Sequence, residues 1–212
     1  MVLALGGITC VMGVLYAYIG FPAIAAAMTT IAGRRPEEFV ARDSADLPPV
    51  TVIIPAYNEE RSLDAKIRNV LATDYPGELL DVIVVSDAST DRTDAIAESF
   101  ADRGVRLIVQ EQRVGKSAGL NRAMAVSRGE IVVFTDANAM YWPSTIPTLV
   151  KHFERPRVGL VTGYTRYVDP DSQDVADTNN VYTSLERVIK NAESRWGCCV
   201  GADGATFGLR RS

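Results

Sequence analysis

The sequence has few cysteines, no surplus of basic residues and no charged side chain in its first 33 positions. Its formal net charge is -4, which argues against a nucleic-acid-binding protein, because such proteins usually present a basic surface. The three cysteines, Cys10, Cys198 and Cys199, match neither a metal-binding spacing nor a disulfide framework. This pattern fits a chain that works in a reducing compartment such as the cytosol.

The uncharged stretch at residues 1–33 is long enough to cross a membrane, since a transmembrane helix needs about 20 apolar residues. A secretory signal peptide opens with a basic region, and none precedes this stretch. We therefore predict a retained transmembrane helix in contact with membrane lipid. Pro22 predicts a kink, or a division into two embedded pieces. A buried core helix and an uncleaved signal are the alternatives.

Basic residues follow this stretch directly, at Arg34, Arg35 and Arg42. The positive-inside rule then predicts that the rest of the chain is cytoplasmic. We expect a cell-membrane protein with one or a few spans and with its catalytic domain on the cytoplasmic side. Residues 34–49 are polar and contain proline, so they are predicted to be a linker, and residues 50–212 form one domain of ordinary size.

Short apolar runs alternate with helical patterns in this domain. The runs lie at residues 50–54, 81–85, 105–109 and 131–134, and helices are predicted between them, the first capped by Asn58. Such alternation predicts βαβ units, an α/β fold with a mainly parallel sheet and flanking helices. Beyond the fourth run, the pattern predicts helices over residues 145–153 and 180–195, and a longer strand over residues 158–168.

Polar or charged residues follow each of the four predicted strands. The segments read PAYNEE, SDASTD, QRVGKSAGLN and TDAN, in chain order. Because ligands of such sheets bind outside the carboxyl ends of the strands, four polar ends in a row predict one shared site. A dinucleotide-dependent oxidoreductase would carry G-x-G-x-x-G after the first strand, and PAYNEE stands there instead, which argues against that class.

The combination of these segments resembles family 2 glycosyltransferases with the GT-A fold, a Rossmann-like sheet. The stretches that carry the resemblance are IIPAYNEE, VVSDASTDRT, GKSAGLNRA and FTDAN, and YAYIGFP resembles the membrane segment of membrane-bound, processive-synthase-like members. The resemblance implies a glycosyltransferase that moves a sugar from a nucleoside-diphosphate sugar, usually a UDP-sugar, with inversion. It also implies a polysaccharide or a lipid-linked acceptor.

The resemblance implies that the nucleotide lies at the ends of the first two strands. Pro55, Ala56 and Tyr57 are the implied nucleotide-binding residues of the first strand, with the Tyr57 ring as a flat contact for uracil. Glu59 matches a position that contacts ribose or base, and Asp87 is the implied acceptor for the uracil ring N–H. A structural interpretation stays open, because the same residues suit a helix N-terminus and a turn.

Lys116 follows Gly115 at the predicted start of a helix, where free N–H groups and the helix dipole favour anions. A lysine there can add a positive charge beside a pyrophosphate, and a solvated surface lysine is the alternative. Asp203 lies in the tail GADGATFGLRR, which resembles the segment that runs under the sugar toward the acceptor. This aspartate is a candidate sugar or acceptor contact, and a tight Gly-rich turn is the alternative.

Asp136 and Asn138 occupy the two positions of the family's D-x-D motif, which implies a Mg²⁺ or Mn²⁺ site. Hard cations take oxygen ligands and commonly use one or two carboxylates plus substrate phosphates. Asn138 departs from the motif and supplies a neutral oxygen, and Ser86 is a second departure, where many relatives have aspartate. The resemblance places the general base beyond Ser212, so a catalytically incomplete, membrane-anchored nucleotide-sugar-binding protein is the alternative function.

Overall fold

The structure is a computed structural model, and the residues that it describes form two compact units, each of which is treated by itself. The described residues are 2–32, 47–163, 167–168, 175–176, 181–197, 201–202 and 204–211. The sheet unit comprises Phe39–Thr165 and Ala202–Ser212, and the helical unit comprises Met1–Glu38 and Arg166–Gly201. Most of the predicted linker, and Asp203, lie outside the described residues.

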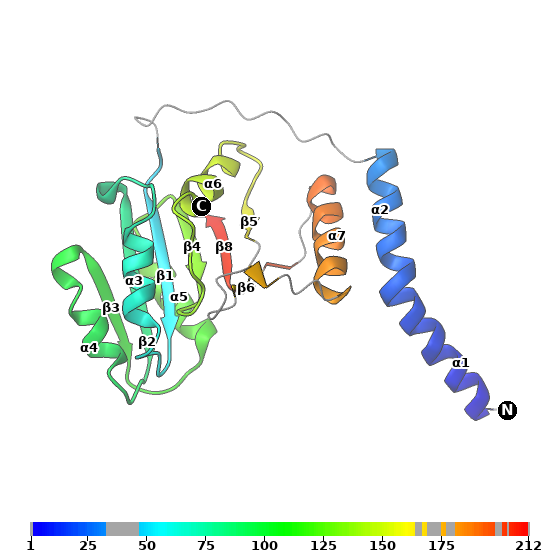
Figure 1. Cartoon of the computed structure of the whole chain (residues 1–212), viewed down its shortest axis with the longest axis horizontal. Coiled ribbons are helices and arrows are strands. Elements are labelled where there is room, and N and C mark those ends of the chain that lie inside the picture. The colour runs from blue at the N-terminus through cyan, green and yellow to red at the C-terminus, as the bar shows by residue number, and fades with distance from the viewer. Residues whose placement is uncertain are drawn as a thin grey trace. The chain divides into compact units, whose positions relative to one another are not determined.

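Six strands form one sheet in the order β3-β2-β1-β4-β8-β5 (Figure 1). Their bounds are β1 Val50–Ala56, β2 Leu80–Asp87, β3 Val105–Gln110, β4 Ile131–Thr135, β5 Leu160–Thr162 and β8 Thr206–Arg210. The first four are parallel neighbours, and β8 lies antiparallel to both β4 and β5. The predicted mainly parallel sheet is confirmed, and the four predicted strands are found with slightly longer bounds.

Helices cover both faces of this sheet. They are α3 Leu63–Leu71, α4 Thr93–Glu98, α5 Lys116–Val126 and α6 Thr145–His152, with 3₁₀ turns η3 Gly77–Leu79 and η4 Ala101–Arg103. Alternation along β1 explains the two layers, since side chains of a strand point to opposite faces in turn. Val52 and Ile54 join the core under α3, α4 and α6, whereas Ile53 joins the core under α5.

The winding of the chain creates a switch point between β1 and β4. From β1 the chain passes through α3 to β2 and through α4 to β3, and both helices lie on one face. It then returns through α5, on the other face, to β4 on the far side of β1. The chain thus reverses its direction across the sheet at β1, and open α/β sheets bind ligands at the carboxyl ends of the strands beside such a place.

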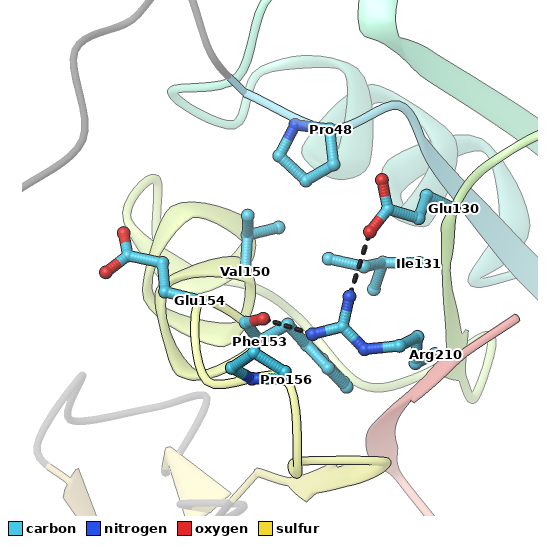
Figure 2. Close-up of a pocket in the computed structure, with 8 residues that line it drawn as sticks. All are labelled: Pro48, Glu130, Ile131, Val150, Phe153, Glu154, Pro156 and Arg210. Atoms are coloured by element: carbon cyan, nitrogen blue, oxygen red, sulfur yellow. Dashed lines mark hydrogen bonds and ion pairs between the residues drawn. The ribbon is translucent and has the colours of Figure 1, made fainter.

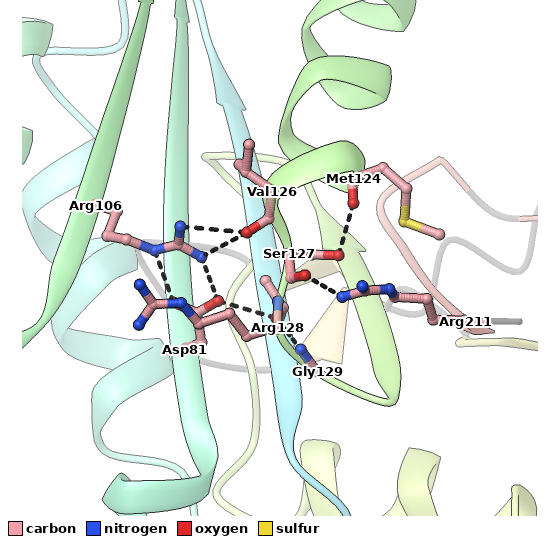
Figure 3. A network of polar contacts seen from close by, with 9 residues as sticks. Asp81, Arg106, Met124, Val126, Ser127, Arg128, Gly129 and Arg211 are labelled. Atoms are coloured by element: carbon pink, nitrogen blue, oxygen red, sulfur yellow. Dashed lines mark hydrogen bonds and ion pairs between the residues drawn. The ribbon is translucent and has the colours of Figure 1, made fainter.

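A polar network at the amino ends of the parallel strands fixes the C-terminal end of α5 (Figure 3). Arg106 donates to the Asp81 carboxylate, at 2.5 and 3.0 Å, and to the Val126 carbonyl at 3.3 Å. Arg211 donates to the Ser127 carbonyl just beyond the helix. Cations beside the last carbonyls of a helix satisfy acceptors that lack a partner within the helix. The network thus holds α5 at one end, while its first residue, Lys116, points to the other edge.

The helical unit contains α1 Val2–Leu15, the π-helical turn η1 Tyr16–Gly20, α2 Phe21–Ala32, α7 Val181–Trp196 and the strand pair β6 Tyr167–Val168 and β7 Val175–Ala176. The first three run on continuously (Figure 1). The π-helical turn ends at Gly20, two residues before Pro22, whose missing N–H removes one helical hydrogen bond. Among the described residues, Gly6–Met28 is the stretch that has the length and hydropathy of a membrane span. Within this unit, α7 contacts α2.

Two predictions about secondary structure are wrong. Residues 158–168 do not form one strand, because β5 belongs to the large sheet and β6 pairs with β7. The first helix of the sheet unit begins at Leu63, and Asn58 does not cap it, since Asn58 has a positive φ of 53° and its side chain accepts a hydrogen bond from Thr90 instead. Strand β8 was not predicted.

The close packing of Gly129 against β1 can be tested by mutation, because the space there does not admit a side chain. A Cβ at this position would lie 2.4 Å from the Thr51 backbone N and 2.7 Å from the Ile131 carbonyl oxygen. Gly129→Ala is expected to lower the free energy of unfolding by about 3 kcal/mol, since backbone on both strands must shift. Thermal melting in detergent measures this, with Gly77→Ala as the control, because nothing lies within 4 Å of a Cβ at Gly77. Equal melting temperatures for the two variants would contradict the packing argument.

Candidate nucleotide-diphosphate site

The Asp87 carboxylate, at the end of β2, holds the loop that leads into α5. Its Oδ1 accepts hydrogen bonds from Gln110 Nε2 at 2.9 Å and from the Val114 N–H at 3.0 Å, and its Oδ2 accepts the Gly115 N–H at 3.0 Å. The side chain is buried, so these donors replace the water that a carboxylate requires. Asp87 therefore has a positioning role in the fold, which the sequence interpretation as a uracil acceptor missed.

Gly115 adopts a backbone conformation that suits glycine, with φ of 92°. The free N–H groups that are expected at this helix start do not include those of Val114 and Gly115, which both donate to Asp87. The N–H groups that lack a helical partner begin at Lys116, the first residue of α5. An anion can therefore meet this helix only from Lys116 onward.

Lys116 and Asp136 meet directly, although they lie on α5 and after β4. The Lys116 Nζ donates to the Asp136 Oδ1 at 2.5 Å. Both side chains keep more than a third of their surface exposed, 49% and 35% in that order. An ion pair this exposed contributes less than about 1 kcal/mol, so a ligand can separate the two charges at little cost. The predicted convergence of these residues is thus found in the structure.

Tyr57, just beyond β1, presents its ring at the same edge. The guanidinium of Arg113 lies over this ring, 4.0 Å from its centroid, and 38% of Tyr57 is exposed. Arg113 belongs to the loop that Asp87 holds, so the contact joins the β1 end to the start of α5. Pro55 and Ala56 are the last residues of β1 and lie beneath this segment, with Ala56 buried. Arg113 was not among the predicted site residues.

The loops after β1 and β2 interlock through Asn58 and Glu59. Asn58 Oδ1 accepts the Thr90 N–H at 2.8 Å, and the Glu59 N–H donates to Thr93 Oγ1 at 2.8 Å. The Glu59 carboxylate accepts a hydrogen bond from Ser62 Oγ at 2.5 Å, beside the start of α3. Ser86, the departure from the family pattern, is buried and donates to Ser89 Oγ at 2.9 Å. These contacts give the residues a structural role, and nucleotide contact by Glu59 stays a prediction.

Lys66 is a residue that the sequence analysis overlooked, although its position was informative. It lies on the buried side of α3, three residues after Leu63 and next to Ile67, and it is fully buried. Its Nζ donates to the Ala139 carbonyl and lies 3.7 Å from the centroid of the Tyr141 ring. Burial lowers the pKa of Lys66 to about 7, and the nearby Asp136 charge opposes that shift. A lysine within an apolar helical stripe is the signal that could have revealed it.

The donors at Asp136 and Asn138 fit a divalent ion only with help from a ligand. Among the described residues, no group of three or more His, Cys, Asp or Glu side chains is arranged to hold a metal. Asn138 is exposed, and one Asp136 oxygen contacts Lys116. One carboxylate and one amide oxygen, completed by phosphate oxygens and water, match the way in which Mg²⁺ is commonly held. The pair is therefore compatible with an ion that arrives together with a diphosphate.

The segment from Ala205 through β8 starts beside Asp136 and runs to the amino ends of the parallel strands. Ala205 accepts the Asp136 N–H at 3.4 Å, and β8 then runs to the opposite edge, where Arg210 pairs with Glu130 at 2.9 Å. Arg210 also lines a cavity of about 120 Å³ there, together with Pro48 and Phe153 (Figure 2). This cavity lies at the amino ends of the parallel strands, so it is separate from the candidate site. Asp203 lies outside the described residues.

Comparisons with known proteins agree with this geometry. The chain matches the model of glycosyl transferase family 2 over residues 51–212. It is 27% identical to YdaM of Bacillus subtilis, a probable glycosyltransferase, over 79% of this chain and 41% of YdaM. It is 30% identical to the beta-monoglucosyldiacylglycerol synthase of Nostoc sp., over 60% of this chain and 28% of the synthase. This chain thus spans less than half the length of these relatives.

A solved structure with the same fold is the mannosyltransferase PcManGT from Pyrobaculum calidifontis, in complex with GDP-Man and Mn²⁺. The TM-score is 0.75 and the sequences are 31% identical, with 94% of this chain and 55% of that chain covered. The agreement confirms the predicted GT-A fold.

The role of Asp87 can be tested without any ligand. Asp87→Ala leaves the N–H groups of Val114 and Gly115 without their acceptor, so we expect a loss of about 2–3 kcal/mol in the free energy of unfolding. Hydrogen exchange at these two amides should become faster than in the wild type. Asp102→Ala, on the exposed turn η4, is the matched control. Unchanged exchange in the Asp87 variant would show that the carboxylate does not hold this loop.

Lys66 predicts a pH dependence of stability. Its pKa falls from 10.5 to about 7 in the folded chain, so between these values the unfolded chain binds the proton and the folded chain does not. Folding stability therefore rises with pH across this range. Relative to Lys66→Met, the wild type is expected to gain about 2–4 kcal/mol between neutral pH and pH of about 10. Melting curves of both proteins in detergent measure the difference, and a constant difference would indicate an ordinary lysine pKa.

Proposed function

This chain belongs to glycosyltransferase family 2, and on that basis we propose that it takes part in sugar transfer from a nucleoside-diphosphate sugar. The observation that carries the proposal is the contact between Lys116 and Asp136, 2.5 Å apart at the carboxyl edge of the sheet. A cation from a helix N-terminus and a carboxylate from a strand end are the groups that a diphosphate and its counter-ion require. Their exposure leaves both accessible to a ligand.

We propose that the diphosphate lies beside Lys116 and the first N–H groups of α5. The ammonium would stabilise the negative charge that grows on the leaving diphosphate as the sugar departs. Asp136 and Asn138 would hold a Mg²⁺ or Mn²⁺ ion, which would supply further charge neutralisation when bound. Without a ligand, Lys116 and Asp136 neutralise one another, so neither charge stands bare at the surface.

The nucleotide base (uracil or guanine) is proposed to stack on the Tyr57 ring, next to the Arg113 guanidinium. A UDP-sugar is the donor that the sequence resemblance implies, and PcManGT binds GDP-Man, so both nucleotides belong in a binding test. A polysaccharide or lipid-linked acceptor is proposed, and the Nostoc relative is a beta-monoglucosyldiacylglycerol synthase. The apolar helix at Gly6–Met28 would anchor the chain in the cell membrane, with the sheet unit on the cytoplasmic side.

Inversion is the proposed stereochemical course, in which the acceptor hydroxyl attacks the anomeric carbon opposite the diphosphate. This step needs a general base to take the hydroxyl proton. No described residue is assigned this role here, so nucleotide binding and sugar transfer are measured separately. Binding of nucleotide without sugar transfer would favour the alternative, a catalytically incomplete nucleotide-sugar-binding protein.

Calorimetric titration of the full chain in detergent tests the proposal, with UDP and GDP, each with and without Mn²⁺. We expect one nucleotide to bind, and Mn²⁺ to strengthen it. Lys116→Met should weaken binding about tenfold or more, because it removes a positive charge beside the diphosphate. Asp136→Asn should weaken binding about tenfold or more in Mn²⁺, because it removes the carboxylate that is proposed to hold the ion. Asp102→Asn, on the exposed turn η4, should bind like the wild type. If neither nucleotide binds under either condition, the proposal is wrong.

A further inference from the structure

Lys66 is a buried cation that supports the same site from inside the protein. It is fully buried between Leu63 and Ile67 on the inner side of α3. Among the described residues, no carboxylate lies within ion-pair distance of its ammonium group. Burial of an ammonium group without an ion-pair partner is costly, so such a position is a candidate for a functional role.

The contacts of Lys66 all lead to the segment that carries Asp136 and Asn138. The ammonium donates to the Ala139 carbonyl and faces the Tyr141 ring, 3.7 Å from its centroid. Burial raises the pKa of Tyr141 to about 12, so the ring is a neutral phenol and attracts the cation through its π face. The side chain of Lys66 thus stays within the core, and its ammonium group contacts this segment at Ala139 and Tyr141.

Asn69, one turn further along α3, completes the support. Its Nδ2 donates to the Tyr141 carbonyl at 2.9 Å, and its Oδ1 accepts the Tyr141 N–H at 2.7 Å. Residues 136–141 are therefore held at Ala139 by a cation and at Tyr141 by an amide. Because Asn69 already fixes the backbone, a neutral side chain at position 66 would suffice for packing, and the positive charge needs a separate reason.

The charges of the site supply that reason. Asn138 leaves the segment with a single carboxylate, Asp136, whose charge acts on Lys66. When Lys66 carries its proton, Lys66 and Lys116 are both cations, so together with Asp136 they have a net positive charge before any ion binds. In the low dielectric of the interior, a fixed positive charge acts on its surroundings with little screening.

We propose that Lys66 is a positioning residue of the diphosphate site, an interior cation that favours the diphosphate and reduces the dependence of binding on a divalent ion. The inference rests on the proposed function. Lys66 does not contact the ligand, because it is fully buried, and it acts through the backbone at Ala139 and through its electric field. The same charge disfavours a divalent ion alone, so Lys66 shifts the site toward phosphate groups rather than toward the metal.

Binding of UDP and GDP by the full chain, in EDTA and in Mn²⁺, tests this inference at a pH below 7, where Lys66 carries its proton. Lys66→Met keeps most of the length of the side chain and removes the charge. We expect metal-free affinity to fall about tenfold and affinity in Mn²⁺ to fall much less, because the ion supplies the missing positive charge. Lys66→Arg should retain most metal-free binding, because the charge is restored.

Arg68→Met is the matched control, since it removes a positive charge from the exposed side of the same helix. It should leave both affinities unchanged. Equal losses for Lys66→Met in EDTA and in Mn²⁺ would reduce Lys66 to a purely structural role, and unchanged affinities would remove any role. Either result overturns the inference while wild-type binding keeps the proposed function intact, whereas a wild type that binds neither nucleotide overturns both. If Lys66→Met does not fold, Lys66→Gln takes its place in the same comparison.

Discussion

The carboxylate of Asp87 is the interaction on which the rest of the site depends. It ties the end of β2 to Gln110, Val114 and Gly115, and so fixes where α5 begins. Lys116 is the next residue, and its position against the β4 end follows from that start. A buried carboxylate without these donors would be unstable, and these backbone N–H groups without it would be unsatisfied. The carboxylate and these N–H groups satisfy one another, so the position of the α5 N-terminus is set by the fold itself.

The loops around this edge are built from the residues that first suggested binding. Asn58 and Glu59 join the loop after β1 to the loop after β2, through hydrogen bonds with the Thr90 N–H and Thr93 Oγ1. The same loops present the Tyr57 ring outward, under Arg113. Motif residues in this protein therefore divide into those that shape the loops and those whose side chains are exposed at the carboxyl ends of the strands, and a sequence pattern alone does not separate the two groups.

The sequence predicted the parallel strands and their order along the chain well, because short β-branched runs between helical patterns leave few alternatives. It also predicted that the segments with Lys116 and Asp136, QRVGKSAGLN and TDAN, share one site. The first helix was misplaced, because Asn58 suits a helix cap and a positive φ equally. Strand β8 was not predicted, since its partner in β4 is distant in sequence and Gly208 interrupts a run of only five residues. The sequence analysis overlooked Lys66, because its contact with Ala139 forms only in the folded chain.

The antiparallel insertion of β8 between β4 and β5 has a kinetic consequence. Ile131 pairs with Arg210, so β4 cannot acquire its second neighbour until synthesis has passed Arg210, about 80 residues later. Until then, the hydrogen-bonding groups on one side of β4 are open to other strands, and such edges promote aggregation. Pairings this distant in sequence also form slowly. During synthesis, the open edge of β4 is therefore the place where a chaperone has most to protect.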